Sequence, residues 1–189
     1  KSIVQALNTV EEIQNLSVKN NKELVVYLSM AFGNPYGENY HPDIVAELTE
    51  KLHQLEIVIV ALSDTIGVSS PTNIAPLFST LIQEYPTIEF GAHFHTKPDQ
   101  WHDKINSAYN SGCRRFDGTI QGFGGCPMAK DDLTGNFPTE KMITYFNSKN
   151  IKNKLIGEIS DPDFGPAFLA IWLSKNTSEP KMRANLIGK

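Results

Sequence analysis

The side chains of this sequence with the clearest chemical potential lie between residues 91 and 136. Two histidines one residue apart, His93 and His95, end an apolar run. If that run is a strand, alternate side chains point to the same side, and both imidazoles can reach one metal ion. The structural alternative is a pair of histidines that are hydrogen-bonded at the edge of the core. The spacing therefore indicates either two ligands of one metal or two structural residues.

A glycine-rich segment and an asparagine follow these histidines. Cys126 lies in a Gly-Gly-Cys-Pro sequence, where Gly124 and Gly125 permit backbone conformations that are closed to other residues. Such a loop can carry a reactive thiol over a site, or it can be a plain turn with a small apolar cysteine. Asn136 is suited either to supply an oxygen ligand or to cap the helix expected from Pro138.

Apolar runs and helical patterns alternate along the chain and predict the elements that would position these groups. Strands are expected at 24–29, 57–62, 88–93 and within 112–117, and helices at 3–16, 42–52, 71–82, 101–108 and 138–146. The first two runs are continuously apolar, which predicts strands buried on both faces. Four strands alternating with helices are typical of parallel βαβ units, so the predicted fold class is α/β.

Polar residues recur at the ends of the predicted strands. Asn34, Asp64, the His93 and His95 pair, and Asp117 all lie at or just beyond strand C-termini. Right-handed crossovers bring those ends to one side of the sheet, where α/β proteins build their sites. Asp64 and Asp117 would then contact a substrate or support the ligands, or else only satisfy the N-terminus of the helix that follows.

Composition and charge exclude some classes of function. The 189 residues are 40% hydrophobic and 20% charged, enough for one domain with a core. A net charge of -4 without a basic cluster argues against nucleic acid as a partner. No apolar run approaches the roughly 20 residues that cross a bilayer, and no signal peptide is expected, because the opening residues lead straight into a helical pattern. Two cysteines make no disulfide framework, so we expect a cytoplasmic protein.

A family resemblance adds to this interpretation. Residues 1 to about 150 resemble the second half of 3-hydroxy-3-methylglutaryl-CoA (HMG-CoA) lyase, in the superfamily of metal-dependent lyases and Claisen-condensing enzymes with a TIM barrel. The motifs that carry the resemblance are Asp64-Thr65-Ile66-Gly67-Val68, His93-Phe94-His95, Gly122-Phe123-Gly124-Gly125-Cys126-Pro127 and Gly135-Asn136. The Gly-Gly-Cys-Pro loop favours the lyase over the related isopropylmalate and homocitrate synthases.

The resemblance implies a partial TIM (β/α)8 barrel. Residues 1–150 would supply about four β/α units that match strands five to eight, and residues 151–189 would form a helical tail. The tail from about residue 155 to residue 188 is similar to the C-terminus of chalcone-isomerase-like proteins. The family barrel also has an Arg-Asp pair on its first strand, and we find no such strand in this sequence. An open half-barrel exposes two sheet edges, so we expect a homo-oligomer or association with a missing half.

The resemblance also implies an activity and its residues. His93, His95 and Asn136 would bind Mg²⁺ or Mn²⁺, and Cys126 would act as acid or base at the enolate carbon. We assign contact with the acyl-CoA substrate, or support of the ligands, to Asp64, Asp117, Gly124 and Gly125. The implied reaction cleaves HMG-CoA to acetyl-CoA and acetoacetate. The alternatives are a Claisen-type acyltransferase, and a non-catalytic fragment or binding module in which both histidines are structural.

Overall fold

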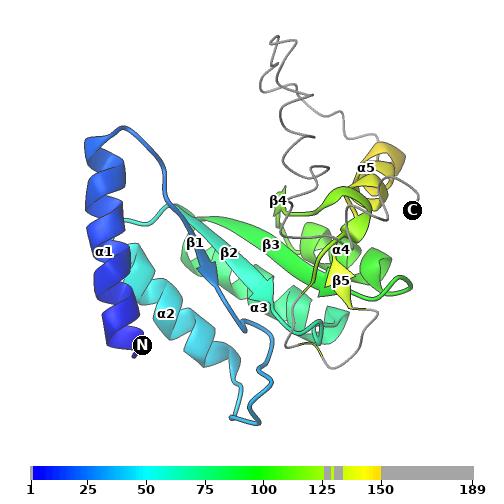
Figure 1. The fold of residues 1–189 in the computed structure, drawn as a ribbon, viewed down its shortest axis with the longest axis horizontal. Helices are drawn as coiled ribbons and strands as arrows, with labels where there is room; N and C mark the ends of the chain where they lie inside the picture. Colours follow the sequence, from blue (N-terminus) through cyan, green and yellow to red (C-terminus); the bar gives the residue numbers. More distant parts are fainter. Residues whose placement is uncertain (1, 126–128, 130–133, 150–189) are drawn as a thin grey trace, which may run out of the picture. The chain divides into compact units, whose positions relative to one another are not determined.

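The computed structural model describes residues 2–125, 129 and 134–149 (Figure 1). The chain divides into two compact units, Lys1–Tyr145 and Phe146–Lys189, and almost all described residues belong to the first. Cys126 and the predicted tail, residues 151–189, lie outside the described residues. Among the helices that are described, none has the length and apolar character needed to cross a membrane.

A parallel sheet forms the centre of the first unit. Its strands β1 (Val25–Leu28), β2 (Ile59–Asp64), β3 (Glu89–Thr96) and β4 (Arg115–Phe116) lie in the order β1-β2-β3-β4, and neighbouring strands pair in parallel. The predicted α/β class with a parallel sheet is therefore confirmed. A two-residue strand that was not predicted, β5 (Gly135–Asn136), pairs antiparallel with the end of β3.

Helices separate the strands along the chain, as the hydrophobic periodicity predicts. They are α1 (Ile3–Lys19), α2 (Pro42–Gln54), α3 (Pro71–Glu84), α4 (Trp101–Asn110) and α5 (Thr139–Ser148), with a short 3-10 turn at Ile120–Gly122. Two of them, α2 and α3, begin at the prolines expected in their first turns, where the missing amide hydrogen leaves no bond unmade.

The buried aromatic core fixes which face of the sheet meets the helices. The ring of Phe94 lies 6.4 Å from that of Phe78 on α3 and 5.7 Å from that of Phe32, measured between centroids. Phe94 on the sheet and Phe78 on α3 are both almost fully buried. Because side chains alternate along a strand, the neighbours of Phe94 on β3, His93 and His95, point to the opposite face.

The edge strand differs from the prediction. The sequence predicts that β1 is buried on both faces, yet its residues are only half-buried and Tyr27 is 48% exposed. The reason is that β1 pairs only with β2 among the described strands. The helix α1 is likewise less buried than its amphipathic pattern suggests, since none of its residues is buried and Val4 and Leu16 are exposed.

Candidate metal centre

The sheet curves so that one face becomes concave around the two histidines. Tyr27 on β1 donates a hydrogen bond of 2.7 Å to Asp117, which follows β4. In a flat sheet, β1 and β4 would lie about 14 Å apart, three strand spacings, which is farther than two perpendicular side chains span. The side chains of Tyr27 and Asp117 therefore lean toward each other across the concave face. His93 lies between them, its ring 5.4 Å from that of Tyr27 at a right angle.

His95 is held by its neighbours in one tautomer. Its Nδ1 lies 2.9 Å from the backbone carbonyl oxygen of Asp64, and a carbonyl only accepts, so Nδ1 carries the hydrogen. In the neutral ring the lone pair is then on Nε2. Only 7% of the residue is exposed, and this burial lowers the pKa of His95 below its usual range. Burial thus favours the neutral imidazole that a metal ligand requires.

His93 is oriented by a carboxylate. Its Nδ1 lies 3.3 Å from Oδ2 of Asp117, the same oxygen that accepts the hydrogen bond from Tyr27. The bond with His93 is the largest cause that lowers the pKa of Asp117, and the bond to Asp117 raises the pKa of the Tyr27 phenol. The ionised carboxylate accepts from both groups, so the lone pair of neutral His93 is also on Nε2. The two imidazole rings lie 5.5 Å apart.

Asn136 is placed beside His95 by the short strand β5. The two residues face each other directly in the antiparallel pair of β3 and β5. The amide nitrogen of Asn136 donates to the carbonyl of Phe123 at 2.9 Å, which assigns the Oδ1 atom as the acceptor of this side chain. The capping alternative does not describe this arrangement, because α5 begins only at Thr139 and the side chain of Asn136 bonds elsewhere.

The contacts of Asp64 favour the supporting role that was predicted for it, because they hold the loop after β2 and the ring of His95. Its side chain is fully buried and accepts hydrogen bonds from the backbone amides of Val68 and Ser69, at 2.8 and 3.0 Å, and from the hydroxyl of Ser69. It also forms an ion pair of 2.7 Å with Lys104 on α4. These bonds fix the loop after β2, and the backbone carbonyl of Asp64 in turn fixes His95.

The glycines of the 122–125 segment let it lie tightly against β5. Gly124 has a φ of +84°, and a Cβ atom there would lie 2.9 Å from the amide nitrogen of Asn136. A Cβ at Gly125 would lie 2.9 Å from the carbonyl oxygen of Thr134. Their contacts are therefore with the strand that carries Asn136. Their predicted contact with substrate stays a prediction, as does the role of Cys126 in the part of the chain that is not described.

The three residues fit a divalent cation by their donor chemistry. Two neutral imidazoles and one amide oxygen suit a metal such as Mn²⁺, and in each side chain a hydrogen bond occupies one polar atom and leaves the other for a ligand bond. Within the described ranges, no group of three or more His, Cys, Asp or Glu side chains could hold a metal ion. The set on β3 and β5, two histidines and an asparagine, therefore stays a candidate metal site.

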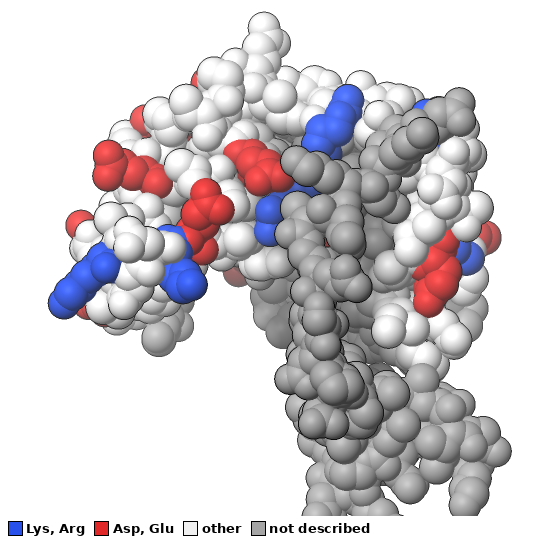
Figure 2. All heavy atoms as spheres, turned by 90° about the horizontal axis from the view of Figure 1, so that it is seen from above, with Lys and Arg blue, Asp and Glu red and all other residues white. Residues whose placement is uncertain are grey.

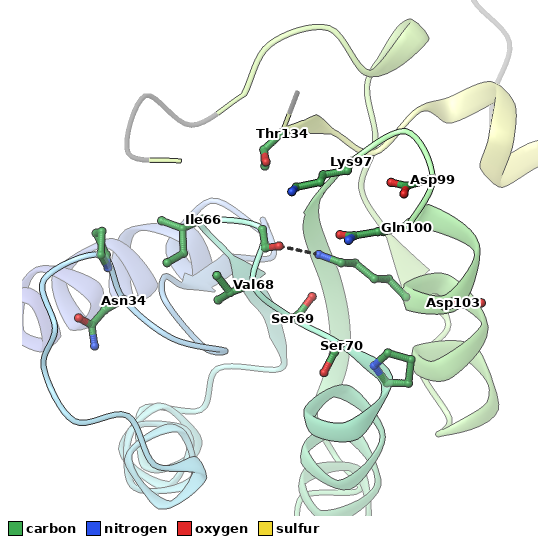
Figure 3. Close-up of a pocket in the computed structure, with 14 residues that line it drawn as sticks. Asn34, Ile66, Val68, Ser69, Ser70, Lys97, Asp99, Gln100, Asp103 and Thr134 are labelled. Carbon is green, nitrogen blue, oxygen red and sulfur yellow. Dashed lines mark hydrogen bonds between the residues drawn. The ribbon is translucent and has the colours of Figure 1, made fainter. Parts of the chain in front are cut away.

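The described surface carries charges of both signs, and one cavity lies apart from the two histidines. On the described part of the face in Figure 2, acidic and basic side chains are interspersed. A cavity of about 880 Å³ opens beside the start of α3 and α4 (Figure 3). Its lining is polar and apolar in about equal parts and includes none of the three proposed ligands; it consists of Asn34, Pro35, residues 66–71, Lys97, Asp99, Gln100, Asp103, Lys104 and Thr134.

Comparison with known proteins identifies the family. The family model described as HMGL-like matches residues 1–157. The chain belongs to the HMGL-like family. The match ends within the chain, so the similarity of the tail to chalcone-isomerase-like proteins stays a prediction. Sequence analysis missed Tyr27 and Lys104 of this HMGL-like site, although a tyrosine inside an apolar strand and a lysine beside an apolar helix stripe were visible signals.

Relatives of this HMGL-like chain are named as lyases. The hydroxymethylglutaryl-CoA lyase YngG of Bacillus subtilis is 30% identical over 155 residues, covering 82% of this chain and 52% of that protein. The crystal structure of an HMG-CoA lyase from Bacillus subtilis matches with a TM-score of 0.75 at 30% identity, over 81% of this chain and 51% of that one. An Acinetobacter baumannii HMG-CoA lyase in complex with coenzyme A and 3-methylmalate matches with a TM-score of 0.70 at 25% identity, over 80% and 49%. The chain therefore spans about half the length of the relatives it matches.

Proposed function

We propose that this chain contributes half of the active site of a divalent-metal-dependent carbon–carbon lyase that cleaves HMG-CoA to acetyl-CoA and acetoacetate. The observation that carries the proposal is the arrangement of His93 and His95. Both Nδ1 atoms are held by fixed acceptors, so both Nε2 atoms are assigned as metal donors on the concave face. Asn136 lies directly opposite His95. The naming of similar proteins as HMG-CoA lyases, one of them solved with coenzyme A, supports an acyl-CoA substrate.

The fold supports a partial barrel as the framework of this site. Four parallel strands in sequential order, with a curved sheet and the helix-facing core on one side, are the arrangement of a TIM-barrel wall. β1 pairs with only one neighbour among the described strands, and Tyr27 on it is half exposed. We infer that a further strand pairs with this edge, from a second copy or from the missing half. The free, buried thiol of Cys113 suits a reducing, cytoplasmic setting.

The residues of this chain have distinct tasks in the proposed reaction. A bound divalent cation would supply Lewis acidity and a template for the substrate oxygens. His93, His95 and Asn136 would hold it, while Tyr27 and Asp117 keep the His93 ring in place. In the cleavage, a general base takes the proton of the 3-hydroxyl, the C3–oxygen bond becomes the carbonyl of acetoacetate, and the bond between C2 and C3 breaks with its electron pair going to the acetyl-CoA enolate. Cys126 is the proposed donor of the proton that the enolate carbon then accepts.

The metal centre can be tested without any activity. Titration of the full chain with Mn²⁺, followed by the loss of the free-ion EPR signal, should show a site that weakens roughly tenfold or more in His93→Ala and His95→Ala. His53→Ala is the matched control, because His53 lies on α2 away from the concave face. Equal Mn²⁺ binding by the wild type and a His93→Ala/His95→Ala double variant would refute the centre.

The reaction itself needs a separate assay. The chain is incubated with HMG-CoA and Mn²⁺, and acetyl-CoA release is compared with condensation of acetyl-CoA and a 2-oxo acid. Cleavage that depends on His93 supports the lyase, whereas condensation would favour the Claisen-type acyltransferase. If the chain binds Mn²⁺ and catalyses neither reaction, even after association with a complementary half-barrel, the proposed activity is wrong while the metal centre stands.

A further inference from the structure

Lys104 on α4 is a buried charge that the proposed reaction does not use. Its side chain is 2% exposed, and lysines are almost never this buried unless they are paired. It lies on the same face of α4 as Ile105 and Ala108, which are also fully buried. Although Lys104 borders the cavity described above, it presents almost no surface there, so we infer its role from the groups that it contacts.

Lys104 donates three hydrogen bonds, two to the loop that begins at Asp64 and one to the backbone of His95. Its Nζ atom donates to Oδ2 of Asp64 at 2.7 Å, to the carbonyl of Gly67 at 3.2 Å and to the carbonyl of His95 itself at 2.9 Å. The bond to Gly67 is the dashed line in Figure 3. An ammonium group has three donors, and each of them is used.

These bonds tie the end of β3 to the loop that follows β2. The backbone carbonyl of Asp64, at the start of that loop, accepts the hydrogen of His95 Nδ1 at 2.9 Å. Lys104 thus binds both partners of this contact, the carboxylate of Asp64 and the backbone of His95. If the ammonium is removed, the ladder between β2 and β3, which pairs Asp64 with Phe94, still holds the two backbones, but the carboxylate of Asp64 and the carbonyl of His95 lose their shared donor. We therefore expect the Nδ1 bond, and with it the ring of His95, to be held less firmly.

Stability alone is a poor explanation for such a pair. Burying two charges costs several kcal/mol of desolvation, and well-packed apolar residues of similar volume often stabilise a protein as much or more. A buried pair is better explained by the geometry that it imposes. We propose that Lys104 is a positioning residue that fixes the imidazole of His95 as a metal ligand, an inference that rests on the proposed metal centre.

The test compares variants of the full chain by two measurements. Lys104→Met removes the ammonium and leaves Asp64 unpaired. Asp64→Asn/Lys104→Met removes both charges, so it avoids a lone buried carboxylate. Lys141→Met is the matched control, since Nζ of Lys141 donates to the carbonyl of Pro98 and not to Asp64 or His95. Mn²⁺ affinity is measured by EPR, and the His95 tautomer is read from imidazole ¹⁵N shifts in the metal-free protein.

The proposal expects a specific pattern of results. In the wild type and in Lys141→Met, the ¹⁵N shifts should show His95 protonated at Nδ1. In each folded Lys104 variant, that signature should give way to a mixture of tautomers, and Mn²⁺ affinity should fall roughly 10- to 100-fold. The double variant should lose both the Nδ1 signature and the Mn²⁺ affinity while its thermal stability is restored. This result separates positioning of His95 from a general effect on folding.

Several results would overturn the proposal. If the ¹⁵N shifts show that His95 of the wild type is protonated at Nε2, the proposal is wrong before any variant is compared. A folded Lys104 variant that keeps the Nδ1 signature, or binds Mn²⁺ as tightly as the wild type, also overturns it. If the wild type binds no Mn²⁺, the proposed metal centre fails, and the tautomer comparison in the metal-free protein alone decides whether Lys104 positions His95.

Discussion

Two glycines with the same φ allow the packing of the loop after β2, which supports the site, to be measured. Gly67 and Gly37 both have a φ of +73°. A Cβ atom at Gly67 would lie 2.6 Å from Cγ2 of Thr134 and 3.6 Å from the carbonyl oxygen of His95, whereas one at Gly37 would meet nothing within 4 Å. Alanine at Gly37 therefore reports the cost of the backbone conformation alone, and alanine at Gly67 adds the cost of the contact.

The expected magnitudes follow from these two contributions. A left-handed conformation costs an alanine about 1–2 kcal/mol, partly offset by about 0.4–1 kcal/mol from the less flexible unfolded chain. We therefore expect Gly37→Ala to lower the free energy of unfolding by about 1 kcal/mol. The clash with the stiff, β-branched Thr134 adds about 1–3 kcal/mol, as overpacking does elsewhere. Gly67→Ala should then melt about 2–12 °C below Gly37→Ala.

Two further variants, Thr134→Ser and Gly67→Ala/Thr134→Ser, complete a double-mutant cycle with the wild type and Gly67→Ala. Thr134→Ser removes only the Cγ2 methyl group, so Gly67→Ala/Thr134→Ser should recover most of the added loss, with a coupling of about 1–3 kcal/mol. Urea unfolding followed by circular dichroism measures all four free energies. If Gly67→Ala is no worse than Gly37→Ala, or if Thr134→Ser recovers nothing, then Thr134 does not pack on the loop as described.

Three further predictions test other contacts of the site. Tyr27→Phe removes one hydrogen bond to the carboxylate of Asp117, so the pKa of Asp117, followed by ¹³C NMR, should rise toward its usual value and stability should fall by about 1 kcal/mol. Because the folded pKa of His95 is lowered, the unfolded chain binds the proton first. The stability from this group should therefore be complete above the unfolded pKa of about 6.5 and be lost as pH falls below it, and His95→Gln should flatten this part of the urea-unfolding profile between pH 7.5 and 5. Burial raises the pKa of Cys113 to about 12, so in Cys126→Ser a disulfide reagent at pH 8 should label no thiol until denaturant is added; rapid labelling of the native variant would contradict this burial.

The order of elements could be predicted from the sequence because each signal is local. Hydrophobic runs separated by helical patterns predicted the succession of strands and helices along the chain, and the prolines Pro42 and Pro71 marked the starts of α2 and α3. The two-residue strand β5 could not be predicted in the same way. It contains a glycine and an asparagine, and it exists because the end of β3 offers backbone groups to Asn136, a pairing that no local pattern encodes.

The proposed ligands could likewise be predicted from a local pattern, whereas the residues that support them could not. His93 and His95 are two residues apart, so strand periodicity alone places them on one face. Tyr27 lies ninety positions from its partner Asp117, and only the curvature of the sheet brings them together. Lys104 falls beside the apolar stripe of α4, where the sequence alone does not distinguish a lysine that extends to solvent from one that is buried against Asp64.

The supports show how strongly the site depends on the curvature of the whole sheet. His93 on β3, a proposed ligand, is held by Asp117 beyond β4 and, through it, by Tyr27 on β1. Flattening of the sheet would leave the ladder bonds between neighbouring strands nearly intact, because those bonds are local. It would separate Tyr27 from Asp117 first, because their contact spans the full width of the four strands. Since β1 has one strand neighbour among the described residues, pairing at its free edge would hold this curvature, and metal binding should therefore strengthen with association at that edge.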